Sequence, residues 1–243
     1  MNFTLISGPC VIESEEMVLS IADKLVTFCD ELNIKLIFKA SYRKANRTSI
    51  NSFTGIGDER AFAILARVRD IYKIKTTTDI HSVVEAGIVS KYVDILQIPA
   101  FLCRQTDILI AAAKTGKIVN IKKGQFATAE MMKDAIAKVE KYGGKAMITD
   151  RGNCFGYNDL IVDMRNIPLL QEIGVPVIVD ITHTNMGNID MTETLGRCAV
   201  AAGADGLFIE THPYPASTLS DSKNVYPLNK LYSLLEKLIK YAI

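Results

Sequence analysis

The stretch VDILQIPAFLCRQTDILIAAAKTGKIVNIK, residues 93–122, contains the pattern that decides the fold. Two short runs rich in Val, Ile and Leu, 93–97 and 117–122, flank a longer segment, 104–115, that has the composition of an amphipathic helix. Apolar runs without strict alternation are typical of strands buried on both faces of a parallel sheet. The stretch therefore predicts a strand, a helix and a second strand parallel to the first.

The same unit recurs along the chain. We expect strands at 3–7, 34–39, 74–78, 93–97, 117–122, 145–149, 176–181 and 206–210. We expect helices at 15–32, 58–72, 82–89, 104–115, 128–142, 163–173, 192–202 and 228–242. This alternation predicts an α/β protein, a single (β/α)8 TIM barrel that forms one catalytic domain over residues 1–243. A doubly wound open sheet is the competing architecture, but GPCVIES after the first strand is not its Gly-rich phosphate turn.

Composition limits the classes of function. The formal net charge is +1, so no global field favours nucleic acid or an anionic membrane. No apolar run approaches the roughly 18–20 residues needed to span a bilayer. The N-terminus lacks a basic region followed by an apolar signal core. The five cysteines are scattered, without a CxxC pair, which fits a reducing compartment. We therefore expect a cytoplasmic protein.

Polar residues stand at the carboxyl end of every expected strand, where barrel enzymes build their active sites. In chain order the eight ends carry Cys10; Lys39, Ser41 and Lys44; Asp79 and His81; Gln97; Lys122 and Lys123; Asp150 and Arg151; Asp180 and His183; and Glu210 and His212. The opposite ends carry ordinary surface residues such as Lys73 and Lys117. One mouth of the barrel is therefore expected to be polar.

Five of the residues near this mouth are cations, and they indicate a ligand with several negative charges. They are Lys39, Lys44, Arg47, Lys122 and Arg151. Arginine suits bidentate recognition of phosphate or carboxylate, whereas lysine acts as a point charge. The alternative is that each lysine is simply solvated on its loop.

A second group mixes a thiol, an imidazole and two carboxylates, and it consists of Cys10, His183, Glu210 and Asp221. Such a mixture suits a borderline divalent ion such as Zn²⁺ or Fe²⁺, with Mn²⁺ also compatible. Spacing alone would not reveal this site, because only the barrel makes the four residues neighbours. For His81 and His212 a structural or supporting role is expected rather than metal ligation.

Six segments resemble the family of 3-deoxy-D-manno-octulosonate 8-phosphate (KDO 8-phosphate) synthases. They are FKASYRKANRTS (38–49), TTTDIH (76–81), DILQIPAFLCRQTD (94–107), NIKKGQF (120–126), DRGNCFGYNDLIVDMR (150–165) and TLSDS (218–222). KANR followed by a hydroxyl residue differs from the related aromatic-pathway synthases, which look like KPRT there. GPC at the first strand resembles the metal-dependent branch, since the metal-independent branch carries asparagine at the position of Cys10.

The resemblance implies condensation of phosphoenolpyruvate with D-arabinose 5-phosphate and water, a step toward lipopolysaccharide. Phosphoenolpyruvate would be held by Lys39, Ser41, Lys44, Gln97, Lys122 and Arg151. Arabinose 5-phosphate would be held by Asn46, Arg47 and Thr48. The catalytic residues would be Lys39, Asp79, Lys122 and His183. A divalent metal (Zn, Fe or Mn) would be bound by Cys10, His183, Glu210 and Asp221, in a cytoplasmic homotetramer.

The sequence departs from the family pattern at five places, and the departures after His183, at Tyr214 and at Ser222-Lys223 lie on the seventh and eighth loops, near the sugar end of the site. Arg43 stands in place of aspartate, Thr48 in place of serine and Tyr214 in place of an acid, while TNMGN follows His183 and Ser222-Lys223 replaces Gly-Pro. The phosphoenolpyruvate set is intact. Three alternatives stay open: a synthase that uses another aldose such as erythrose 4-phosphate, a sialic-acid type synthase, and a phosphate-binding barrel without catalysis.

Overall fold

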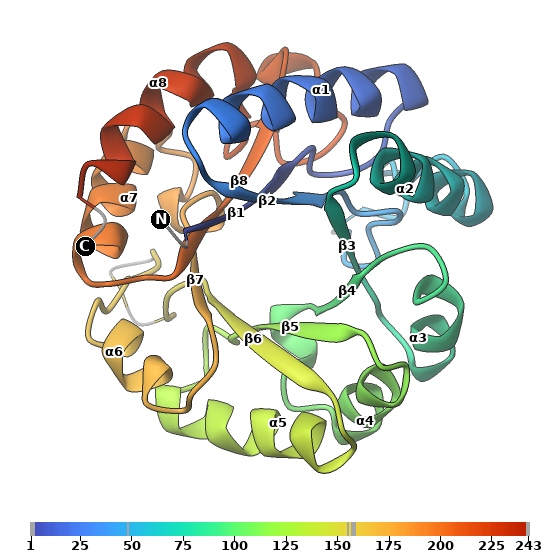
Figure 1. Ribbon diagram of the computed structural model, residues 1–243, viewed down its shortest axis with the longest axis vertical. Helices are drawn as coiled ribbons and strands as arrows, with labels where there is room; N and C mark the ends of the chain where they lie inside the picture. The colour runs from blue at the N-terminus through green and yellow to red at the C-terminus, as the bar shows by residue number, and fades with distance from the viewer. Residues whose placement is uncertain (1–2, 48, 155, 157–158, 242–243) are drawn as a thin grey trace.

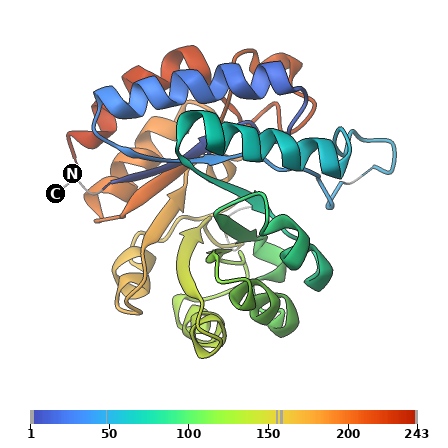
Figure 2. The same cartoon turned by 45° about the vertical axis from the view of Figure 1, so that its right-hand side comes forward.

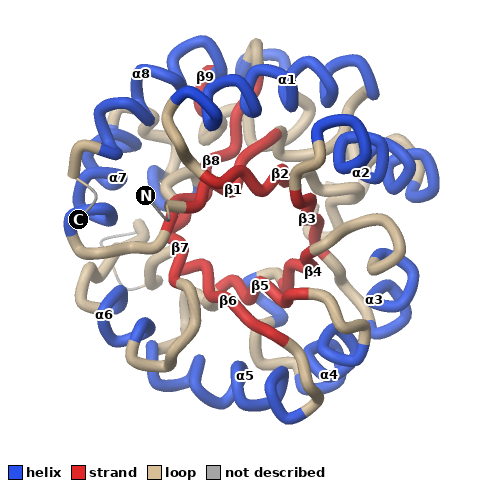
Figure 3. The backbone as a smooth tube through the Cα atoms, in the orientation of Figure 1, coloured by secondary structure: helices blue, strands red, loops and turns tan. Residues whose placement is uncertain are grey.

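Eight parallel strands form a closed inner ring, and helices cover its outer face (Figures 1 and 3). The computed structural model describes residues 3–47, 49–154, 156 and 159–241. Its strands are β1 (Thr4–Gly8), β2 (Lys35–Lys39), β3 (Lys75–Asp79), β4 (Ile95–Ile98), β5 (Ile118–Lys122), β6 (Lys145–Asp150), β7 (Val177–Asp180) and β8 (Gly206–His212), with a short β9 (Tyr226–Pro227). Its α-helices are α1 (Glu15–Glu31), α2 (Asp58–Tyr72), α3 (Val83–Val89), α4 (Thr106–Lys114), α5 (Ala129–Lys141), α6 (Asn166–Gln171), α7 (Met191–Ala201) and α8 (Leu228–Ile239).

The ring closes where β1 pairs in parallel with β8, with Thr4 opposite Gly206 and Gly8 opposite Glu210. All other neighbours in the ring follow chain order. This closure confirms the barrel and excludes the open sheet. Glycine is required at position 206, because a Cβ there would lie 2.0 Å from the carbonyl oxygen of Thr4.

Side chains inside the ring change from apolar to polar toward its carboxyl end. Six buried residues fill the centre: Ile6, Ile37, Ile95, Met147, Ile178 and Phe208. Successive side chains of a strand face opposite sides, so the residue two positions further along points inward again. Ile37 is thus followed by Lys39, Ile178 by Asp180 and Phe208 by Glu210. These apolar residues fill the barrel interior, and the polar groups that follow them line its carboxyl end.

The expected elements are confirmed, with boundaries shifted by a few residues. The largest shifts are three residues, at the end of α8, observed at Ile239 and expected at 242, which lies outside the described residues, and at the start of α6, expected at 163 and observed at Asn166. Pro168 has no backbone N–H to donate, so it fits only in the first turn and fixes this start. Strand β9 was not predicted, because two residues carry no periodicity, and it forms where Tyr226 meets Thr211 of β8.

The loop between β2 and α2, light blue in Figure 2, extends away from the ring and carries Arg47. Among the described residues, no helix is long and apolar enough to cross a membrane.

Candidate active site

The carboxyl ends of the strands surround a cavity of about 640 Å³. The expected residues that line it are Lys39, Lys44, Asn46, Arg47, Asp79, Gln97, Lys122, Arg151, His183, Glu210 and Asp221. Ser41 and Cys10 contact lining residues, since Ser41 Oγ donates to Asp79 Oδ2 at 2.6 Å and Cys10 Sγ lies 3.5 Å from Asp221 Oδ2. Thr48 lies outside the described residues. The residues singled out in the sequence therefore gather around one space.

The ends of β1 and β2 approach each other closely at the edge of this cavity. Gly8 has φ +155°, and a Cβ there would lie 2.1 Å from the carbonyl oxygen of Lys39. The absence of a side chain lets the Cys10 backbone reach the second strand. Lys39 is 2% exposed, and its Nζ donates to Cys10 O at 3.4 Å and to Glu210 Oε1 at 2.5 Å. This lysine therefore links the first, second and eighth strands of the barrel.

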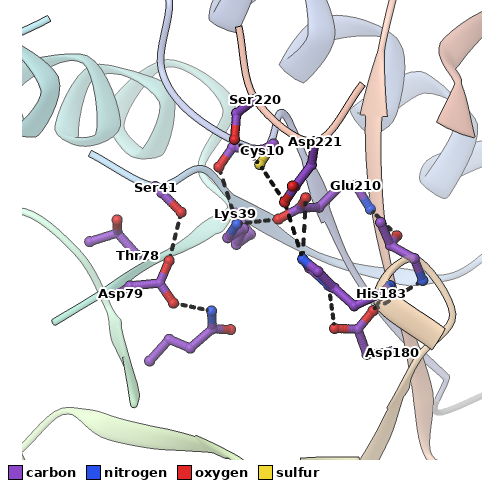
Figure 4. Close-up of polar contacts among 12 residues, drawn as sticks. Cys10, Lys39, Ser41, Thr78, Asp79, Asp180, His183, Glu210, Ser220 and Asp221 are labelled. Carbon is purple, nitrogen blue, oxygen red and sulfur yellow. Dashed lines mark hydrogen bonds and ion pairs between the residues drawn. The ribbon is translucent and has the colours of Figure 1, made fainter. Parts of the chain in front are cut away.

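The thiol, imidazole and carboxylate groups converge beside Lys39 (Figure 4). One ligand atom each from Cys10, Glu210 and Asp221 lie within 4.8 Å of one another. His183 Nε2 lies 3.7 Å from Glu210 Oε2 and 3.7 Å from Asp221 Oδ2. Ser220 adds a hydroxyl 3.0 Å from Cys10 Sγ. Three of the four expected metal ligands therefore lie together, and His183, at the end of β7, lies beside two of them.

These four residues fit a divalent metal ion. Burial alone would raise the pKa of Glu210, but Lys39 and Lys44 outweigh it and lower that pKa to about 2. Its Oε2 is nevertheless buried without a hydrogen-bond partner among the described residues. Burial raises the pKa of the Cys10 thiol to about 12, so a cation is needed to hold its thiolate. An ionised, unpartnered oxygen beside a sulfur and an imidazole nitrogen is the donor chemistry of a borderline metal.

Lys122 and Asp180 form a buried ion pair next to Nδ1 of His183, whereas Glu210 and Asp221 lie next to its Nε2. Lys122 Nζ donates to Asp180 Oδ2 at 2.6 Å and lies 3.6 Å from the centroid of the Phe208 ring. Burial lowers the pKa of Lys122, and Asp180 offsets part of that effect. The pKa of Asp180 falls well below its usual range despite burial, because His183 and Lys122 face it. The carboxylate of Asp180 is therefore ionised beside the cavity.

The cavity also gathers unsatisfied polar atoms. Among the described residues nine buried side-chain atoms lack a hydrogen-bond partner, and six of them belong to cavity-lining residues. These six are Arg43 Nε, Arg47 Nη2, Gln125 Oε1, Arg151 Nε, Glu210 Oε2 and Asn224 Oδ1. Buried polar groups in folded proteins are normally paired. A ligand that offers both acceptor oxygens and hydroxyl groups would satisfy this set.

Several polar residues have roles that the sequence alone does not predict. Gln125 and Asn224 lie on loops, with no periodicity to indicate that they reach the cavity. Lys123, next to Lys122, faces away from the barrel interior and pairs with Asp150 at 3.1 Å. Arg43 pairs with Glu85 at 2.8 Å at the edge of the cavity.

The two remaining histidines at the strand ends differ in position. His81 lines the cavity, and its Nδ1 lies 3.0 Å from Glu85 Oε2. His212 is buried outside the lining, where its Nδ1 accepts the backbone N–H of Tyr214. Neither lies in the group of metal-type donors, and the contacts of both are those of supporting residues.

Comparison with known proteins places the chain in a family. A profile of the DAHP synthetase I family matches residues 1–242. The chain is 48% identical to the 2-dehydro-3-deoxyphosphooctonate aldolase of Trichlorobacter lovleyi, over 96% of this chain and 90% of that protein. It is 45% identical to the protein of the same name from Desulfotalea psychrophila (97% and 88% covered) and 44% identical to that from Brucella anthropi (98% and 90%). The chain therefore belongs to the DAHP synthetase I family, and within it to the 2-dehydro-3-deoxyphosphooctonate aldolases.

Proposed function

We propose that the protein condenses phosphoenolpyruvate with D-arabinose 5-phosphate and water, forming 3-deoxy-D-manno-octulosonate 8-phosphate and phosphate on the route to lipopolysaccharide. Its relatives are named after 2-dehydro-3-deoxyphosphooctonate, which is another name for a 3-deoxyoctulosonate phosphate. The observation that carries the proposal is the single cavity in which cations from the second, fifth and sixth strand ends face metal-type donors. The family of KDO 8-phosphate synthases, which the sequence resembles, performs this reaction.

The proposed reaction makes one carbon–carbon bond and breaks one carbon–oxygen bond. The double-bond electrons of phosphoenolpyruvate attack from C3 onto the aldehyde carbon, and the aldehyde oxygen takes up a proton. Water adds at C2 and loses a proton. The C2–O bond to phosphate then breaks, its electrons leave with the phosphate, and loss of the hydroxyl proton at C2 leaves a ketone. Much of the rate enhancement would come from holding two reactants together in a site shielded from water.

Phosphoenolpyruvate would bind among the cations at the strand ends. Lys122 and Arg151 project from β5 and the end of β6 into the cavity, and Arg151 Nε is free of protein partners among the described residues. The arginine fork suits the phosphate, and Lys122 supplies charge close to the reacting carbons. The remaining proposed contacts come from Lys39, Ser41, Lys44 and Gln97. Asp79 orients two of them, because it accepts hydrogen bonds from Ser41 Oγ at 2.6 Å and Gln97 Nε2 at 2.5 Å.

Arabinose 5-phosphate would bind toward the β2–α2 loop. Arg47 Nε donates to Phe53 O at 2.9 Å, which anchors the guanidinium, while Nη2 is buried without a protein partner among the described residues. This arrangement leaves one face of the fork for the sugar phosphate. Asn46 lines the same part of the cavity. Thr48 completes the proposed set from the sequence resemblance, and the aldehyde end would then lie toward Lys39 and His183.

Cys10, His183, Glu210 and Asp221 would hold a divalent ion, Zn, Fe or Mn. The chemistry supplied there is positive charge that orients and polarises an oxygen of the aldose or of water. Lys39, 2.5 Å from Glu210, would share in stabilising negative charge on the aldehyde oxygen. Treatment with a chelator should abolish most activity, and added divalent metal should restore it. Full activity in metal-free protein would remove the four-ligand site.

A substitution at position 10 tests whether the metal-dependent and metal-independent branches of the family can be exchanged at this residue. Cys10→Asn introduces the residue of the metal-independent branch beside Lys39 and Glu210. We expect this variant to lose metal affinity but to retain part of its turnover without metal. Complete loss of activity in a folded Cys10→Asn protein would contradict a simple exchange between the branches.

The experiment that tests the proposed function is phosphate release from phosphoenolpyruvate with arabinose 5-phosphate or erythrose 4-phosphate, each with and without chelator. We expect release with the five-carbon sugar and little with the four-carbon sugar. Preference for erythrose 4-phosphate would instead assign the aromatic-pathway reaction. Absence of release with either sugar, in metal-loaded folded protein, would favour a phosphate-binding barrel without catalysis.

We also propose a homotetramer that works in the cytoplasm. Phe101 and Phe126 are 62% and 48% exposed, and large exposed apolar groups are typical of contact surfaces. Light scattering should give a mass four times the 26.8 kDa of the chain. All five cysteines are free, which fits a reducing compartment. Fractionation of the source cells should recover the protein with the cytoplasmic enzymes.

A further inference from the structure

Asp180, at the end of β7, contacts both an expected metal ligand, His183, and a cation of the cavity, Lys122, through a single oxygen atom. Its Oδ2 lies 2.6 Å from Lys122 Nζ and 2.7 Å from His183 Nδ1. Its Oδ1 accepts the backbone N–H groups of Thr182 at 3.0 Å and His183 at 2.9 Å. The side chain is fully buried. Both oxygens are therefore fixed, and the carboxylate cannot turn without breaking these contacts.

The contact with His183 decides which ring nitrogen faces the metal-type donors. A carboxylate at Nδ1 holds the proton on that nitrogen and leaves the Nε2 lone pair free. Nε2 is the atom that lies 3.7 Å from both Glu210 Oε2 and Asp221 Oδ2 (Figure 4). The orientation of the ring is therefore the one that metal binding requires.

The contact with Lys122 connects Asp180 to the part of the cavity in which phosphoenolpyruvate is proposed to bind. Lys122 is 5% exposed, lines the cavity, and has Asp180 as its carboxylate partner at 2.6 Å. An anionic ligand that draws Lys122 toward the cavity would weaken its hold on Oδ2. The negative charge on that oxygen would then act more fully on the imidazole of His183. A more basic imidazole is a stronger metal ligand.

We propose that Asp180 is a positioning residue that couples the two binding events, so that phosphoenolpyruvate and the divalent metal each tighten the binding of the other. The inference rests on the proposed function for the identity of the anion. Coupling between two ligands is reciprocal, so the factor by which phosphoenolpyruvate raises metal affinity equals the factor by which metal raises phosphoenolpyruvate affinity. Asp180 contributes to this factor without touching either ligand.

The test measures binding rather than turnover. The dissociation constant for Mn²⁺ is obtained by competition with a chelator, with and without saturating phosphoenolpyruvate. Calorimetry gives the reciprocal factor, and it is the suitable method because the chain contains no tryptophan. In the wild-type protein we expect phosphoenolpyruvate to tighten Mn²⁺ binding by about fivefold or more. In Asp180→Asn we expect weaker Mn²⁺ binding, by about tenfold or more, and a coupling factor near one.

Asp150→Asn is the matched control. Asp150 also ends a strand, is 1% exposed and pairs with a buried lysine, Lys123. Its other hydrogen bonds come from Gly152 N and Asn166 Nδ2, on the β6 side of the site. This variant should keep the wild-type coupling factor. An unchanged factor in Asp180→Asn would overturn the inference, because coupling would then arise by direct contact between the two ligands.

A second measurement requires no variant to fold. The chain has three histidines, so ¹⁵N signals of the imidazole rings can be assigned individually. In metal-free wild-type protein, above the pH at which His183 loses its charge, we expect the proton of this ring on Nδ1. A proton on Nε2, or a wild-type coupling factor of one, would overturn the inference. If phosphoenolpyruvate binds and releases phosphate in wild-type protein but shows no coupling with the metal, only this inference fails. If phosphoenolpyruvate neither binds nor releases phosphate, the proposed function fails as well.

Discussion

Asp79 shows how single residues at the strand ends are kept charged inside the protein. Burial favours the neutral acid, yet Lys39 and Lys44 outweigh it and hold the pKa of Asp79 well below its usual range. The ionised carboxylate then accepts hydrogen bonds from Ser41 and Gln97. A buried charge of this kind is stable only with its partners in place. Two residues proposed to bind phosphoenolpyruvate are thus oriented by a carboxylate whose own charge depends on the cations around it.

Asp79→Asn should therefore destabilise the protein in a pH-dependent way. At pH 7 we expect a loss of about 3 kcal/mol in the free energy of unfolding, since the cations lose a buried partner. The pKa is lower in the folded state than the value of about 3.9 in an unfolded chain. The stabilisation by ionised Asp79 is thus complete above that value, begins to decline as the pH falls below it, and is lost as the pH falls through the lowered pKa.

Urea unfolding between pH 7 and pH 3 measures this difference between wild type and Asp79→Asn. Asp70→Asn is the control, because Asp70 is exposed in a surface pair with Arg69. Its substitution should change stability by less than about 0.5 kcal/mol. A difference between wild type and Asp79→Asn that stayed constant down to pH 3 would contradict the assigned charge.

Arg47→Ala tests the division of the cavity between the two substrates. Loss of a charged hydrogen-bond donor should raise KM for arabinose 5-phosphate about ten- to a hundredfold. KM for phosphoenolpyruvate should change far less, because its proposed cations lie on other strands. Arg60→Ala, on the exposed face of α2, should leave both constants unchanged. Equal increases for both substrates in Arg47→Ala would reject the assignment of the sugar phosphate to this residue.

At the scale of elements, the strands could be predicted from sequence but the loops could not. Strands such as β4 and β5 are buried on both faces, so their apolar runs mark them within a residue or two. The parallel alternation then fixes which strand ends meet, and it places Lys39, Lys122 and Glu210 together. Gln125 and Asn224 reach the cavity only through the paths of their loops, which no periodic pattern encodes. The mixture of donors at the strand ends already indicates a metal and an anionic ligand, whereas the assignment of each residue to phosphoenolpyruvate or to arabinose 5-phosphate is implied only by the resemblance.

The loop after β8 takes a path that depends on contacts with a residue far away in the sequence. Glu13, just after β1, accepts hydrogen bonds from Thr218 Oγ1 at 2.7 Å and from Leu219 N at 2.9 Å through its Oε1. These contacts fix the loop immediately before Ser220 and Asp221. The metal-type donor Asp221 is therefore held in place by a residue from the opposite end of the chain.

Glu13→Ala should lower metal affinity by about tenfold although Glu13 is not one of the expected ligands, since supporting contacts tune ligand geometry. Chelator competition measures this effect, and kcat at saturating metal should stay close to that of the wild type. Glu13→Gln keeps an acceptor oxygen and should show a smaller loss. An affinity in Glu13→Ala equal to that of the wild type would show that the loop holds its position without this anchor.

For the whole molecule, closure of the ring between β1 and β8 makes one cavity out of eight separate strand ends. Gly206 lies at this seam, where an added Cβ would meet Thr4 O at 2.0 Å and Ile178 Cδ1 at 2.8 Å. The clash involves backbone, which cannot move aside without opening the β1–β8 pairing. The shape of the site therefore depends on a residue at the other end of the barrel.

Gly206→Ala should cost about 2 kcal/mol or more and lower the melting temperature accordingly. Circular dichroism on heating measures the shift. Gly87→Ala is the control, because Gly87 lies in α3 and a Cβ there meets nothing within 4 Å. Alanine favours helix over glycine, so this variant should be as stable as the wild type or more stable by up to about 1 kcal/mol. A wild-type melting temperature for Gly206→Ala would contradict the close approach at the seam.

The most direct measurement is a crystal structure of the protein with phosphoenolpyruvate and Mn²⁺, using the anomalous signal of the metal. We expect phosphoenolpyruvate in the cavity within hydrogen-bond distance of Lys122 and Arg151. We expect the anomalous peak of the metal among Cys10, His183, Glu210 and Asp221. Phosphoenolpyruvate bound outside this cavity, or a metal peak away from those four side chains, would contradict these expectations.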